Sequence, residues 1–127
     1  MHTKQQLNEM KNEHDQWQDR LRFYKDEISH FNNHLGRLSI SGNGTDVMAS
    51  VEHFQNQFIR QKEVLDIIRH DFKQHENLIE DIVDGKSNEP NDGINKIHSV
   101  QRDKLEQFER IFHDLRNEFN VFLNKID

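Results

Sequence analysis

Three histidines interrupt three otherwise apolar patterns in this chain: His14, His75 and His98. Neutral imidazole nitrogens bind zinc, copper and nickel, and three histidines with an open fourth position are a known zinc arrangement. Zinc or another divalent transition metal is therefore one chemistry that the sequence offers. The interpretation that the sequence favours more is a polar core layer, holding one or two waters and fixing the helix alignment at some cost in stability. Gln101, one helical turn after His98, would be an outer partner of the metal ligands or part of this wet layer.

The elements that carry these histidines are predicted by heptad patterns. Apolar residues recur at alternating spacings of three and four along the first third of the chain, and the pattern returns twice. Residues 39–45 and 84–93 interrupt it with glycine, serine and proline. We therefore expect helices over 3–39, 46–83 and 93–126, with Thr45 or Asp46 capping the second and Asp92 the third. Short connections between long helices predict an all-α, elongated, antiparallel up-down-up three-helix bundle, a single domain over 1–127.

Each heptad pattern places its apolar residues in one stripe along the helix, here called the seam. Charges beside the seams select one alignment of the three helices. The first and third helices run parallel, and charges of opposite sign pair at a constant difference of 89 in residue number: Glu13 with Arg102, Arg20 with Glu109, and Glu27 with Arg116. The first and second helices are expected to pair Lys11 with Glu76 and Gln18 with Arg69. Viewed from the start of the first helix, this alignment runs counter-clockwise from the first helix to the third. This alignment also puts all three seam histidines in one layer, although the alignment follows from the charges alone and from no histidine.

Composition excludes several classes of function. Of the 127 residues, 32% are apolar and 31% are charged, which suits a thin bundle because each helix buries only one stripe. Eight of the nine phenylalanines lie at seam positions, which argues against disorder. A net charge of −6 argues against a nucleic-acid partner, and cysteine is absent, so no disulfide or thiolate chemistry is available. No apolar run is long enough for a membrane or a signal peptide, so we expect a cytoplasmic protein.

Other candidate sites are weaker. Glu27 and His30 have the spacing of di-iron carboxylate motifs, but Glu27 flanks the seam and His30 points outward. His30 and His34 lie one turn apart and could chelate a metal at the surface. Gln61 lies in the seam, where an alignment role is favoured over a ligand contact. No motif for nucleophilic catalysis or phosphate binding is present, so we expect no enzyme.

Five apolar residues fall outside the seams and form a candidate interaction surface: Phe23, Ile59, Ile67, Val100 and Val121. Of these, Ile67, Val100 and Val121 border the groove between the second and third helices. A contiguous apolar stripe there would favour a homodimer or a partner helix. The sequence thus favours a non-enzymatic helical scaffold or protein-interaction domain that needs no cofactor. The alternative is a small metal-binding bundle that uses the three histidines.

The architecture resembles spectrin-type three-helix repeats, which also carry a tryptophan in the first helix's seam, as Trp17 is here. In helix arrangement it is also similar to syntaxin-type amino-terminal bundles. Both resemblances imply the fold and no particular function.

Overall fold

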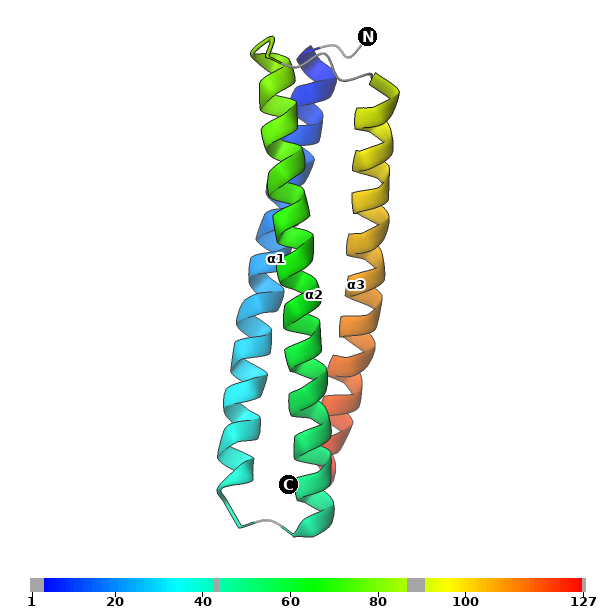
Figure 1. Ribbon diagram of the computed structural model, residues 1–127. Coiled ribbons are helices and arrows are strands. Elements are labelled where there is room, and N and C mark those ends of the chain that lie inside the picture. Colours follow the sequence, from blue (N-terminus) through cyan, green and yellow to red (C-terminus); the bar gives the residue numbers. More distant parts are fainter. Residues whose placement is uncertain (1–3, 43, 87–90, 127) are drawn as a thin grey trace.

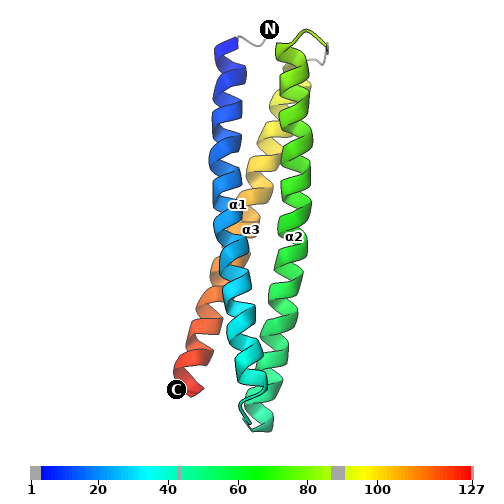
Figure 2. The same cartoon turned by 90° about the vertical axis from the view of Figure 1, so that its left-hand side faces the viewer.

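Three long helices make up the structure. The computed structural model describes residues 4–42, 44–86 and 91–126, with helices α1 (Lys4–Ser39), α2 (Thr45–Val83) and α3 (Asn91–Ile126). Figure 1 shows α1 and α3 running in one direction and α2 in the other. Viewed from the start of α1, the order α1, α2, α3 is counter-clockwise, and the view turned by 90° in Figure 2 agrees. The predicted all-α three-helix class is confirmed.

The helix starts differ from those expected. The N-cap of α2 is Gly44, in extended conformation (φ −67°, ψ 168°), and it makes no side-chain capping bond. The prediction of Thr45 or Asp46 as the cap is therefore wrong, because the chain enters the helix one residue earlier. In the first turn, Asp46 still faces the positive end of the helix dipole. Helix α3 begins at Asn91, so Asp92 is its second residue rather than its cap.

Glycine ends α2 as the sequence predicts. Gly85 has φ of +75°, a left-handed conformation in which a side chain is strained. The Lys86 amide donates to the carbonyl of Asp81 at 2.7 Å, and the Gly85 amide donates to that of Ile82 at 3.1 Å. These two bonds satisfy carbonyls that the helix end leaves unpaired. The chain therefore turns sharply enough for α3 to return along α2.

A continuous apolar core fills the centre of the bundle from Trp17 to Phe122. In the half of the core nearer the end of α1, the rings of Phe31, Phe58 and Phe119 come from three different helices, with centroids 5.2 or 5.3 Å apart. Edge-to-face and tilted contacts of this kind add to the free energy of burying the ring area. The heptad seams therefore meet as predicted, and their aromatic side chains fix the spacing of the helices.

Ion pairs hold α1 beside α3. The three pairs are those that the sequence predicts: Glu13 with Arg102 at 2.6 Å, Glu27 with Arg116 at 3.1 Å, and Arg20 with Glu109. The constant difference in residue number shows that the two helices run parallel. Each exposed pair contributes only about 0.2–1 kcal/mol, so their main effect is to favour this alignment over others.

The edge between α1 and α2 differs from the prediction. Glu76 accepts a hydrogen bond from the side-chain amide of Gln18 at 3.5 Å, and its carboxylate lies 3.5 Å from Nδ1 of His14. The expected pairing of Glu76 with Lys11 is wrong, since the carboxylate turns toward the polar layer in the core. The Gln18 side chain is engaged by Glu76 rather than by Arg69.

The Phe31–Phe58–Phe119 contact gives a direct test of the core. Phe58 is completely buried, so Phe58→Ala removes a ring from a closely packed site and should lower the free energy of unfolding by about 3–5 kcal/mol. Phe23→Ala is the matched control, because 57% of the Phe23 side chain is exposed, and it should cost about 0.5 kcal/mol or less. Urea unfolding followed by circular dichroism measures both. Equal losses in the two variants would contradict this packing.

Candidate functional site

The three seam histidines lie in one layer near the end of the bundle that holds the start of α1. Their ring centroids are 4.9 Å (His14–His75), 5.2 Å (His14–His98) and 5.6 Å (His75–His98) apart. Relative exposure is 0%, 2% and 6% for His14, His75 and His98, respectively. One nitrogen from each ring lies within 4.8 Å of the others. One imidazole from each helix therefore converges on a single point in the core.

Apolar residues shelter this layer on both sides. The Trp17 ring stacks on His98, with centroids 4.7 Å apart, and Phe72 lies 5.4 Å from the ring of His14. One helical turn away in the opposite direction, Ile79 and Ile94 are completely buried. The histidines therefore occupy a polar layer inside an otherwise apolar core.

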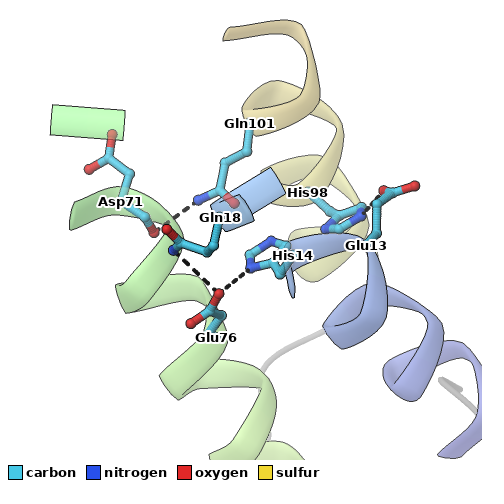
Figure 3. Close-up of polar contacts among 7 residues, drawn as sticks. All are labelled: Glu13, His14, Gln18, Asp71, Glu76, His98 and Gln101. Atoms are coloured by element: carbon cyan, nitrogen blue, oxygen red, sulfur yellow. Dashed lines mark hydrogen bonds and ion pairs between the residues drawn. The ribbon is translucent and has the colours of Figure 1, made fainter. Parts of the chain in front are cut away.

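Two carboxylates approach the layer from outside (Figure 3). Glu13 accepts from Nε2 of His98 at 2.5 Å and from Arg102 at 2.6 Å, while Glu76 lies beside His14. Burial alone would raise the pKa of Glu13, but Arg102 and His98 outweigh it and hold that pKa below its usual value. The sequence reasoning missed both carboxylates as parts of the site. The sequence does contain a signal for these carboxylates, because Glu13 directly precedes His14 and Glu76 directly follows His75.

Gln101, the expected outer partner of the histidines, is tied to α2. Its amide nitrogen donates to the backbone carbonyl of Asp71 at 3.0 Å, as Figure 3 shows, and its buried amide oxygen has no hydrogen-bond partner. This bond fixes the side chain one layer above the histidines. Gln101 therefore links α3 to α2, and it also interacts with His14, an interaction that acts to raise the pKa of that histidine.

Most of the imidazole nitrogens make no hydrogen bond. Both nitrogens of His14, both of His75 and Nδ1 of His98 are buried without a hydrogen bond, which is five of the six. Burial lowers the pKa of His14 to about 3 and that of His75 to about 4, and neighbouring imidazoles add to both shifts. Burial also lowers the pKa of His98, although Glu13 opposes this shift. The layer is therefore neutral at pH 7, the form in which imidazole binds metal ions.

Grooves between the helices reach the layer. A groove of about 300 Å³ between α1 and α3 is lined by Glu13, His98 and Arg102. Another, of about 500 Å³ between α2 and α3, is lined by His75 and Gln101 among others. His98 and His75 therefore each border a groove that is open to solvent, whereas His14 borders neither groove.

Of the other polar candidates, Gln61 is buried in the seam of α2, as expected, and the rest lie outside the seams. Glu27 pairs with Arg116 on the bundle surface, and His30 is exposed, so the di-iron spacing has no inward geometry. His34 packs against the ring of Phe119, with centroids 6.2 Å apart. Among the described residues, the histidine layer is the one group of three or more histidine or carboxylate side chains close enough to share a metal ion.

The five apolar residues expected on an interaction surface are all exposed, by 44–62%. Val100 lies in the groove between α2 and α3, and by heptad position Ile67 and Val121 border the same groove. Phe23 packs against Tyr24 of its own helix, and the heptad position of Ile59 puts it on the α1 side of α2. The five therefore do not form one patch.

Comparisons with protein-family models, with curated proteins and with solved structures find no match. The likeness to spectrin-type repeats therefore rests on the helix arrangement and on Trp17. None of the described helices has an apolar stretch long enough to cross a membrane.

The neutral layer predicts that acid destabilises the fold. In the unfolded chain a histidine has a pKa of about 6.5, so below that value the unfolded state binds protons that folded His14 and His75 do not bind. Between pH 7 and pH 5 each of these two should cost about 2 kcal/mol of folding stability. In the described part of the chain, three charged groups face the layer: Glu13, Glu76 and Arg102. Glu13 has a lowered pKa, so its contribution to folding stability is lost only at lower pH.

Thermal unfolding at pH 7 and at pH 5 measures this effect. Replacing His14, His75 and His98 together by leucine should remove most of the decrease in Tm. The control replaces the exposed His30, His53 and His70 by glutamine and should keep the decrease. The same pH dependence in the leucine variant as in the unmodified chain would contradict a buried neutral layer.

Proposed function

We propose that this chain is a non-enzymatic helical scaffold that associates with a second copy of itself through the groove between α2 and α3. The observation that carries this proposal is an apolar stripe along that groove. Four of its side chains are exposed, by 36–62%, and two more are half-buried: Ile67, Ile97, Val100 and Ile111, with Val64 and Leu78. Exposed apolar stripes of this kind are typical of interfaces with another helix.

The stripe has a pattern that suits a two-fold dimer. By alignment, Asp71 and Lys104 lie at one level in the middle of the groove, and both line the hollow that contains Val100. Leu78, Ile97 and Val100 lie on one side of this level. Val64, Ile67 and Ile111 lie on the other. A two-fold axis parallel to the helices, along the middle of the groove, would put α2 of one copy against α3 of the other, with each apolar segment facing the same segment of the second copy.

Charge is complementary under the same operation. The two-fold axis brings Asp71 of one copy beside Lys104 of the second, and Lys104 of the first beside Asp71 of the second. A symmetric interface of this kind is self-complementary and closes after two copies. Two apolar segments separated by a matched pair of charges therefore favour a second copy over an unrelated helix.

The rest of the molecule suits a structural role. Over most of its length the core is filled by aromatic and aliphatic side chains, which supports the helices as a stiff rod. Opposite charges along the α1–α3 edge are already paired with one another. Along the α2–α3 groove several apolar side chains remain exposed next to one another, which supports its use for association.

Sedimentation velocity over a dilution series tests the dimer. The unmodified chain should show a species of twice the 15.3 kDa chain mass. The double variant Ile67→Glu/Val100→Glu puts charges on both apolar segments and should weaken association by about 100-fold or more. Phe23→Glu/Ile59→Glu is the control, because it adds the same charge away from the groove, and it should still dimerise. A monomeric unmodified chain at every concentration would overturn the proposal, as would equal weakening by the control.

A further inference from the structure

We propose that His14, His75 and His98 form a binding site for one divalent transition-metal ion, with zinc as the probe. This site goes beyond the scaffold role and does not depend on self-association. The first observation is the five unpartnered ring nitrogens in the layer. Buried polar atoms in folded proteins almost always have a partner, and an ion in the middle of the layer would give one to a nitrogen of each ring.

The donor set points to a transition metal. All three groups are imidazoles, and the converging nitrogens lie within 4.8 Å of one another. Around a tetrahedral zinc ion with Zn–N bonds of about 2.0–2.1 Å, two such nitrogens lie about 3.4 Å apart. The rings would therefore move inward by an ångström or so on binding. Magnesium and calcium prefer oxygen ligands, which makes them poor occupants of a layer of imidazoles.

The carboxylates specify how two of the rings would bind. Glu13 engages Nε2 of His98, which leaves Nδ1 of that ring directed at the layer. Glu76 lies 3.5 Å from Nδ1 of His14, which leaves Nε2 as that ring's ligand atom. Metal-binding histidines commonly donate their second N–H to a carboxylate, which fixes the ring and makes it a better ligand. His98 already has this arrangement, with Arg102 holding Glu13 in place, and the Glu76 carboxylate lies close enough to His14 to take it up.

Shelter and access are both suitable. The three rings are 0–6% exposed, and Trp17 stacks over one face of His98, so bulk water is kept from the centre. His98 and His75 nevertheless line separate grooves that lead to solvent. A hydrated ion can therefore enter, lose most of its water and keep one water as a fourth ligand.

Zinc titration of the chelator-treated chain, purified without a histidine tag, tests the site. Isothermal titration at pH 7 should give one tight zinc per chain, and Tm should rise with added zinc. Cobalt should give the intense visible absorption of a tetrahedral ion. A layer that holds only water would give neither signal, and that result would overturn the proposal.

Variants distinguish this site from adventitious binding. Replacing all three layer histidines by leucine should abolish the tight binding, while replacing His30, His53 and His70 by glutamine should leave it unchanged. Glu13→Gln keeps every ligand, so the fold should survive, and zinc affinity should fall by about 10–100-fold. Tight binding that survives in the leucine variant, or that is lost in the surface control, would show that zinc binds elsewhere.

Discussion

The whole structure depends on burying one narrow apolar seam from each of three helices against the other two. No single helix can do this alone, because its stripe covers less than half of its surface. The aromatic side chains of the seam, such as Phe58 and Phe119, lie completely buried where the three stripes meet. Everything else in the molecule, including the positions of its histidines, follows from the alignment that this burial requires.

Apolar burial alone does not fix that alignment, since a seam can slide by a heptad and still pack. The Arg and Glu residues along the α1–α3 edge distinguish the observed alignment from the others, because a shift would bring like charges together. The histidine layer acts in the same direction. A slide by one heptad would bury each imidazole against aliphatic side chains, where its nitrogens could reach neither one another nor Glu13 and Glu76.

The sequence was sufficient to predict the helices, their order and the layer of His14, His75 and His98. Heptad spacing identifies the buried side of each helix, and the charges beside the seams identify which residues of neighbouring helices lie at one level. It was insufficient for the helix starts. Thr45 has the right chemistry for a cap, but backbone conformation decides which residue takes that place, and here it is Gly44. The role of Glu76 was missed for a similar reason. A long carboxylate side chain can turn toward solvent or toward the core, and heptad position does not specify which.

The polar layer lies where the fold can best accommodate it. In the middle of the bundle, tightly packed phenylalanine rings would make any unpaired nitrogen costly. Near the start of α1, by contrast, grooves approach the layer, and carboxylates at the seam's edge reach two of its three rings. The histidines are thus buried enough to remain neutral, although two of them border grooves and two lie beside carboxylates. A layer that served only to align helices would need one polar contact per helix. This layer leaves five of its six ring nitrogens without a hydrogen bond and brings one nitrogen of each ring within 4.8 Å of the others, a surplus of unpaired nitrogens that helix alignment alone does not require.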